Sequence, residues 1–154
     1  MSINEIINSL SNACRELDNE LKDEFLGLML FGSWARGEAK FNSDVDVMVL
    51  LNSVKGLEVR VKVYSILRKY ISSDITLVDV RRSELEGGLT ALSINIAWDG
   101  VIICDKYGYL ARFKNEVKRF IEEEGLIRYR TPDGKYGWTR ADGKPLIKVN
   151  KSNV

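Results

Sequence analysis

The chain has 154 residues, a net charge of +1 and no histidine; 45% of its residues are hydrophobic and 29% are charged. This composition is typical of a folded globular domain and excludes a disordered chain. No apolar run reaches the roughly 18 to 20 residues of a membrane span, and the N-terminus lacks a signal-peptide pattern, so we expect a cytoplasmic protein without membrane contact. The absence of histidine excludes Ser-His-Asp triads and His-ligated zinc sites.

Charge is distributed unevenly along the chain. Residues 126–154 contain seven Lys or Arg and two Asp, a net charge of +5, which leaves −4 for residues 1–125. We therefore expect a slightly acidic main domain, residues 1–125, and a basic tail, residues 126–154. Cys14 and Cys104 lie far apart and lack the spacing of a metal site, which favours two reduced structural thiols.

The sequence of the main domain predicts alternating helices and strands. Ser2 and Glu5 have the spacing of a capping box, and apolar residues then recur at helical intervals. The predicted elements are a helix over 3–21, a strand over 25–31, a short helix over 33–40 with Ser33 as its N-cap, a strand over 44–51, a helix over 57–71, a strand over 75–80, a less regular helix over 89–98, a strand over 101–104 and a helix over 109–124. This order predicts an α/β (α+β) domain with a mixed sheet of about four strands flanked by helices.

The tail predicts β structure. Two Asp-Gly pairs, at 133–134 and 142–143, separate short aromatic and β-branched runs, which favours two hairpins or a small three-stranded meander as a C-terminal appendage. Aromatic and basic side chains alternate there, as in proteins that bind single-stranded nucleic acid. In the alternative interpretation, the hairpin packs Trp138 and Ile147 on the main domain or on a second subunit.

Two carboxylates interrupt the second apolar strand. Because side chains alternate along a strand, Asp44 and Asp46 share one face, while the neighbouring valines share the core face. Like charges this close raise one pKa unless a cation lies between them, and Mg²⁺ prefers such oxygen ligands. The alternative is an edge strand whose aspartates are simply solvated.

A Gly-Ser pair directly follows the first strand. Gly32 allows a sharp turn and a close approach to a ligand, and free N–H groups at a helix start can bind an anion. The hydroxyl of Ser33 and the guanidinium of Arg36, about one turn later, could reach phosphate oxygens. The two strands therefore predict a phosphate site beside a metal site.

The string GSWARGEAKFNSDVDV, residues 32–47, resembles the motif G-S-x-A-R-G, a spacer, then S-D-[IV]-D of the minimal nucleotidyltransferases in the DNA polymerase β-like superfamily. The resemblance implies transfer of a nucleoside monophosphate, AMP from ATP or the equivalent from another NTP, to a hydroxyl acceptor. It also implies a two-metal Mg²⁺ site held by Asp44 and Asp46, with the phosphates bound by Gly32, Ser33 and Arg36. The resemblance is strong over residues 28–51 and looser to about residue 106.

Active members of this superfamily add a third carboxylate from a neighbouring strand, as a catalytic and metal-binding residue. Asp74 and Asp79 are the two candidates, and alternation places them on opposite faces of the strand over 75–80. The family commonly has this acid early in its strand, which favours Asp74 over Asp79. The usual V-D-L-V pattern around that acid is absent here.

The resemblance also suggests partners. Many minimal nucleotidyltransferases are antitoxins that modify a HEPN-type ribonuclease toxin, and such a toxin is the acceptor that we favour. Two alternatives remain: a catalytically weak nucleotide-binding or inhibitory subunit, and RNA-directed transfer that uses the basic tail. An oligomer is compatible with each of these functions.

Overall fold

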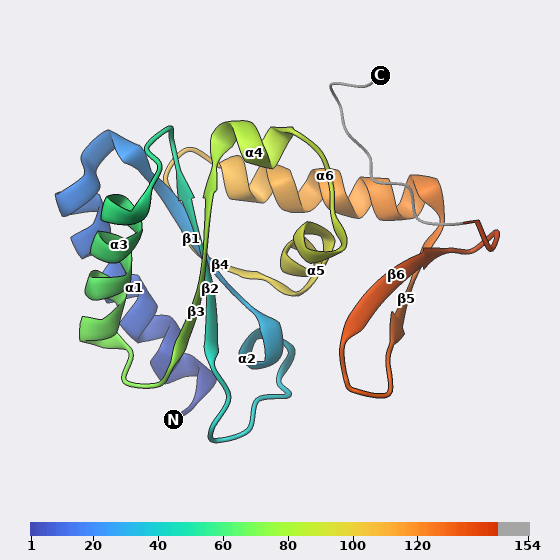
Figure 1. The fold of residues 1–154 in the computed structure, drawn as a ribbon, viewed down its shortest axis with the longest axis horizontal. Coiled ribbons are helices and arrows are strands. Elements are labelled where there is room, and N and C mark those ends of the chain that lie inside the picture. The colour runs from blue at the N-terminus through green and yellow to red at the C-terminus, as the bar shows by residue number, and fades with distance from the viewer. Residues whose placement is uncertain (145–154) are drawn as a thin grey trace.

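The computed structural model describes residues 1–144 and contains a sheet covered by helices on both faces (Figure 1). Its elements are α1 (Ile3–Leu21), the 3₁₀ helix η1 (Lys22–Glu24), β1 (Phe25–Phe31), α2 (Gly32–Arg36), β2 (Val45–Leu51), α3 (Leu57–Tyr70), β3 (Ile75–Arg81), α4 (Arg82–Glu86), α5 (Ala91–Asp99), β4 (Val101–Asp105), α6 (Tyr109–Glu124), β5 (Leu126–Arg130) and β6 (Tyr136–Arg140). This order confirms the predicted α/β class. Among the helices of residues 1–144, none combines the length and apolar composition that crossing a bilayer requires.

The main sheet has the strand order β3-β2-β1-β4 and is mixed. β1 runs antiparallel to β2 and β4, whereas β2 and β3 are parallel and are joined through α3. The helices α1 and α3 cover one face of this sheet, and α5 and α6 pack on the other (Figure 1). The sheet is therefore buried on both faces over most of its length, which matches the continuous apolar composition of β1.

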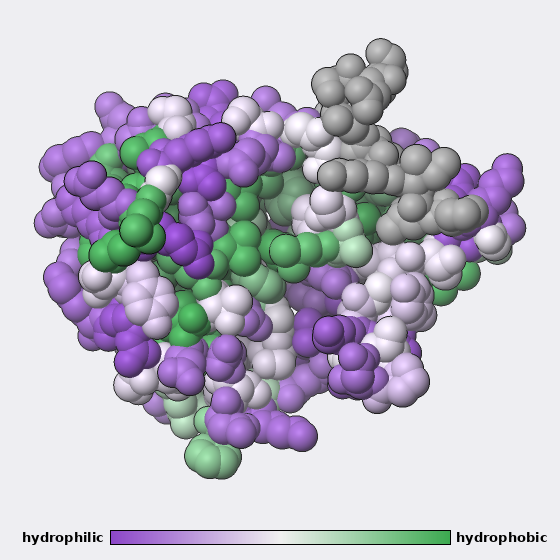
Figure 2. Space-filling view, viewed as in Figure 1, coloured by the Kyte–Doolittle hydropathy of each residue, from purple (hydrophilic) through white to green (hydrophobic). Residues whose placement is uncertain are grey.

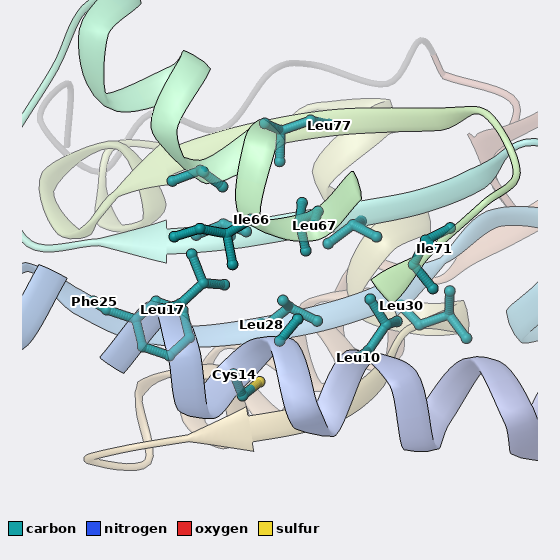
Figure 3. Close-up of a cluster of buried hydrophobic side chains, with 14 of the residues drawn as sticks. Leu10, Cys14, Leu17, Phe25, Leu28, Leu30, Ile66, Leu67, Ile71 and Leu77 are labelled. Atoms are coloured by element: carbon teal, nitrogen blue, oxygen red, sulfur yellow. The ribbon is translucent and has the colours of Figure 1, made fainter. Parts of the chain in front are cut away.

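Successive side chains of β2 point to opposite faces of the sheet and so pack into two different hydrophobic cores. Val45, Val47 and Val49 pack with α1 and α3, in the layer where Leu10, Leu28 and Leu67 point toward one another (Figure 3). On the opposite face Met48 and Leu50 are buried against α5 and α6. Each Å² of apolar area buried in these two cores contributes about 25 cal/mol to the free energy of unfolding. The second face becomes accessible only at the start of β2, where the two aspartates lie.

Two predicted elements need correction. α2 begins at Gly32 and not at an N-capping Ser33: its N-cap is Phe31 and no side chain caps it, because Ser33 already lies inside the single turn. The predicted helix over 89–98 is α5, capped by Thr90, and the segment before it forms the additional helix α4. The first helix agrees closely, with Ser2 accepting a hydrogen bond from the Glu5 amide at 3.2 Å.

The tail forms one hairpin in the described residues. β5 and β6 are antiparallel, and the predicted Asp133-Gly134 pair lies in their connection. Trp138 is only 5% exposed; it packs edge-on against Trp98 at 5.7 Å and donates to Asn95 Oδ1 at 2.8 Å. The prediction that Trp138 packs on the main domain is thus confirmed, whereas Ile147 and a second hairpin lie outside the described residues.

The expectation of two reduced thiols is wrong, because Cys14 and Cys104 form a disulfide. The bond joins α1 to β4 across 90 positions, with the two Cα atoms 6.6 Å apart. The spacing of the two cysteines does not indicate this bond, since they become neighbours only when α1 packs against β4.

We expect this disulfide to stabilise the fold by about 2 to 4 kcal/mol, because it closes a long loop and so restricts the unfolded chain. Chemical unfolding with and without dithiothreitol measures the effect. Wild type should lose this free energy of unfolding on reduction, and the double variant Cys14→Ser/Cys104→Ser should be equally stable in both conditions. Equal stability of wild type in both conditions would contradict the expectation.

Candidate active site

The two predicted carboxylates lie at the N-terminal end of β2, on the face covered by α5 and α6. Burial decreases toward that end, from a buried Met48 through a half-buried Asp46 to an exposed Asp44. Asp46 is paired in register with Phe31 of β1 and Thr76 of β3, so its strand is central and not at an edge. The alternative of solvated aspartates on an edge strand therefore fails for Asp46.

Gly32 makes room for the Asp46 side chain. It is buried with φ +72°, and a Cβ built on it would lie 1.9 Å from Asp46 Oδ2 and 2.8 Å from Cγ. Every residue other than glycine would overlap the carboxylate here and would also adopt a backbone conformation that L side chains rarely take. The glycine of the Gly-Ser turn thus serves the aspartate directly.

The environment of Asp46 favours the neutral form of its carboxyl group. Burial raises the pKa of Asp46; a hydrogen bond from Thr76 acts in the opposite direction, the negative charge of Asp44 raises the pKa further, and the positive charge of Arg36 lowers it, with a net increase. Thr76 Oγ1 also donates to Asp44 Oδ2 at 3.1 Å. The Thr76 hydroxyl thus interacts with both carboxylates of the pair.

The structure places the two candidates for the third carboxylate differently. Asp74 precedes β3, its carbonyl accepts a hydrogen bond from the Val45 amide at 2.8 Å, and the parallel register puts it beside Asp44. Asp79 lies opposite Val49, on the face of α1 and α3. There it accepts hydrogen bonds from Arg60 and from Arg81, the latter at 2.8 Å.

The pairing of Asp79 shifts its pKa in the direction of a structural ion pair. Burial alone would raise the pKa of Asp79, but the hydrogen bonds from Arg81 and Arg60, together with their charges, bring it below the ordinary value. Asp74, by contrast, is exposed beside Asp44. The register therefore places Asp74, and not Asp79, on the face of Asp44, although Asp44, Asp46 and Asp74 form no three-carboxylate metal cluster within residues 1–144.

The residues at the start of β2 fit Mg²⁺ in type and number. Mg²⁺ is usually bound by one or two protein carboxylates and completes its octahedron with water and phosphate oxygens, and Asp44 and Asp46 supply two carboxylates at an accessible position. Within residues 1–144, no three Asp, Glu or Cys side chains form a preformed cage for a metal. Such a pair suits an ion that arrives with its phosphate ligand.

Arg36 occupies the predicted position, about one turn after Ser33, but it already has partners. Its guanidinium binds Glu38 at 2.9 Å and Asp99 at 3.1 Å. Burial would lower the pKa of Arg36, but the hydrogen bonds that it donates to these two carboxylates, together with their charges, raise it overall. A phosphate at this position would therefore compete with Glu38 and Asp99 for the guanidinium.

The loop between α2 and β2 is held by its own side chains. Trp34 packs against the core of α1 and α3, and its Nε1 donates to the Ser43 carbonyl at 3.4 Å. Ser43 Oγ accepts from the Lys40 amide at 2.8 Å. These contacts fix the segment that leads into Asp44, and they assign Trp34 to packing.

A cavity of about 180 Å³ continues along the face of Asp46. Met48 and Val78, each two residues beyond a site residue on the same face of its strand, line it together with Val80. Residues of α4, of α5 and of the segment between them, and Phe113 of α6, complete a largely apolar lining. Sequence reasoning missed this cavity, and it gave Thr76 no role, although strand alternation places Thr76 on the same face as Asp74.

Comparison with known proteins decides the family. A family model described as polymerase beta nucleotidyltransferase matches residues 14–106, which is more than half of the chain and includes every predicted site residue. The chain belongs to the polymerase β nucleotidyltransferase family. The predicted resemblance and the predicted enzyme class are thereby confirmed, and the hairpin of this nucleotidyltransferase lies outside the matched region.

Individual relatives agree with this family. A Methanocaldococcus jannaschii protein, named as a candidate protein adenylyltransferase, is 35% identical to this nucleotidyltransferase over 66 residues, which cover 43% of this chain and 67% of that protein. A solved toxin–antitoxin structure with AMP-PNP has a TM-score of 0.54 at 22% identity, over 73% of this chain and 87% of that one. A Shewanella oneidensis structure has a TM-score of 0.50 at 18% identity, over 78% and 87%. At these identities the two solved structures show the fold alone.

Proposed function

We propose that this nucleotidyltransferase transfers AMP from ATP, in the presence of Mg²⁺, to a hydroxyl group of a partner protein, for which a HEPN-type toxin is the leading candidate. The observation that carries the proposal is the Asp44–Asp46 pair at the start of a central strand of a polymerase β-type fold, with Asp46 lying against Gly32. The name of the Methanocaldococcus jannaschii relative and the AMP-PNP in the toxin–antitoxin structure support AMP and a protein acceptor.

The roles follow from position. Asp44 and Asp46 would hold Mg²⁺ with the triphosphate, and Gly32, Ser33 and Arg36 would bind the β and γ phosphates. When bound, Mg²⁺ neutralises phosphate charge while the acceptor oxygen bonds to the α-phosphorus and the bond to pyrophosphate breaks. Asp74, beside Asp44, would complete the metal site and accept the proton of the acceptor hydroxyl. The apolar cavity along Met48 and Val78 would receive the base.

A second candidate function is nucleotide binding without efficient turnover. The observation that favours it is Thr76, a residue without charge, at the β3 position directly paired with Asp46. In that case Asp74, two residues earlier, would not reach the metal, and the protein would act by occluding its partner.

The contrast between Asp74→Asn and Asp79→Asn tests the proposal. Both variants exchange a carboxylate for an amide in or next to β3, and the assay follows label from α-labelled ATP, GTP, CTP or UTP to the product of the neighbouring gene, or to RNA in parallel. We expect Asp74→Asn to lower the rate of transfer at least tenfold with ATP still bound, since it removes a group that acts on the reacting atoms. Asp79→Asn should transfer at the wild-type rate but unfold more easily, by roughly 1 to 2 kcal/mol, because it weakens a half-buried ion pair.

Three outcomes would count against these assignments. Loss of transfer in Asp79→Asn but not in Asp74→Asn would overturn the choice of the third carboxylate. Triphosphate binding by wild type without transfer of any label would favour the second candidate function. Label on RNA but not on the partner protein would replace the proposed acceptor.

A further inference from the structure

The C-terminal hairpin is attached to the predicted phosphate site through one shared carboxylate. Arg128 of β5 binds Asp99 of α5 with two hydrogen bonds, at 2.8 and 2.6 Å, and Arg36 of α2 binds the same carboxylate at 3.1 Å. The Asp99 side chain is only 6% exposed, so both guanidinium groups are held with little freedom. Arg36, which the family motif assigns to phosphate binding, is therefore linked through Asp99 to Arg128, which lies outside the family match.

Tyr136 of β6 lies at the centre of this contact. Its ring is approached by the guanidinium carbons of Arg128 at 4.0 Å, Arg36 at 4.6 Å and Arg130 at 5.2 Å. Its hydroxyl donates to Glu38 at 2.7 Å. We call Arg36, Arg128, Arg130 and Tyr136 the arginine–tyrosine cluster.

Charge in the arginine–tyrosine cluster is not balanced. Three guanidinium groups face two carboxylates, those of Asp99 and Glu38, and in the described part of the chain no carboxylate lies within ion-pair distance of Arg130. The Nε of Arg128 is also buried without a hydrogen-bond partner there. The positive charge of Arg130 acts on Glu38 from beyond ion-pair distance, so the three guanidinium groups exceed the two carboxylates by one positive charge, which a bound anion would balance.

Docking of the hairpin does not require Arg130. Trp138 packs between the hairpin and α5, and Arg128 anchors to Asp99, so the hairpin is held without a third arginine. Arg130 is paired in register with Tyr136 and is exposed. Hydrophilic side chains gather where the hairpin faces the main domain (Figure 2). The exposed guanidinium is thus available to a ligand at the phosphate end of the site.

We propose that the hairpin completes the nucleotide site, with Arg130 binding the terminal phosphates of the triphosphate and the pyrophosphate that leaves. The inference rests on the proposed function, because it places those phosphates near Arg36. A guanidinium binds two phosphate oxygens in a planar, charge-assisted geometry. Arg128 is a positioning residue that acts through Asp99 on Arg36, and the hairpin makes the site selective for triphosphates over monophosphates.

Equilibrium binding of Mg²⁺-pyrophosphate, ATP and AMP to the full chain, measured by calorimetry, tests the proposal independently of turnover. Arg130→Gln should weaken pyrophosphate and ATP about tenfold and AMP hardly at all. The matched control is Arg112→Gln, since Arg112 is also exposed and stacks on a tyrosine, Tyr109 at 6.0 Å, on α6. The control should bind all three ligands as wild type does, and thermal melting should show both variants folded.

The outcomes separate this inference from the proposed function. If Arg130→Gln binds pyrophosphate as tightly as wild type does, the role of the hairpin is overturned while the nucleotide site stands. If the variant weakens AMP as much as ATP, the assignment to the terminal phosphates is wrong. If wild type binds neither ATP nor pyrophosphate, both proposals fail.

Discussion

Asp46→Asn should reduce nucleotidyl transfer by about 10³-fold or more, because it removes one of the two carboxylates that the metal–triphosphate complex requires. The same variant should unfold at an equal or higher temperature than wild type without metal. Burial and the charge of Asp44 disfavour the ionised Asp46, so an amide relieves a cost of the metal-free fold. Initial rates of transfer and thermal melts measure the two effects.

The pH dependence of stability gives an independent check of the same residue. Because the pKa of Asp46 is raised above the ordinary value of 3.8, the folded state binds this proton more tightly than the unfolded state does. The Asp46 contribution to the free energy of unfolding should therefore increase as pH falls through the raised pKa and level off below the ordinary one. Asp46→Asn should remove this contribution, and Mg²⁺ should stabilise wild type most at the higher pH.

Asp23→Asn is the matched control, because Asp23 is an exposed aspartate before β1, at the other end of that strand from Gly32. It should leave transfer unchanged and Mg²⁺ stabilisation intact. An Asp46→Asn protein that keeps wild-type transfer would remove Asp46 from the catalytic site. A large loss of stability in metal-free Asp46→Asn would contradict the account of its environment.

Gly32→Ala should abolish most activity although it replaces no charged residue. Its Cβ would lie 1.9 Å from Asp46 Oδ2, so the carboxylate must move, and displacements of about 1 Å at a reacting centre can lower rates by about 10²-fold. The alanine must also adopt φ +72°, which costs roughly 1 to 2 kcal/mol. Rates of transfer and the free energy of unfolding are the measurements.

Gly37→Ala separates the two effects. Gly37 ends α2 with φ +75°, and a Cβ there would meet no atom within 4 Å. The free energy of unfolding of this variant should fall by about as much as the positive φ costs in Gly32→Ala. Its rate of transfer should stay within a few fold of wild type. Equal losses of activity in the two variants would show that backbone strain at α2, and not contact with Asp46, is responsible.

The sequence predicted the parts of the fold that local pattern determines. Ser2 and Glu5 predicted the start of α1, and the alternation of valine with aspartate along β2 predicted that the valines share one buried face. The motif from Gly32 to Asp46 predicted the family, because its residues combine a turn requirement with a charge requirement that ordinary packing does not produce.

The remaining features depend on contacts between segments that are distant in the sequence. The Cys14–Cys104 disulfide arises only because α1 crosses the sheet at β4. The face of Asp79 was predictable, but the ion pairs that it forms with Arg60 and Arg81 were not. The engagement of Arg36 with Asp99, and through it with Arg128, spans three elements, and no spacing in the sequence indicates it.

The central claim is transfer of a nucleoside monophosphate at Asp44 and Asp46. The most direct test incubates wild type, Mg²⁺ and the neighbouring gene product with ATP labelled at either the α or the γ phosphorus, and counts the pyrophosphate released. We predict α label on the partner, no γ label, one pyrophosphate per label transferred, and no transfer by Asp46→Asn. Transfer of the γ label, or α label that persists in Asp46→Asn, would contradict the claim.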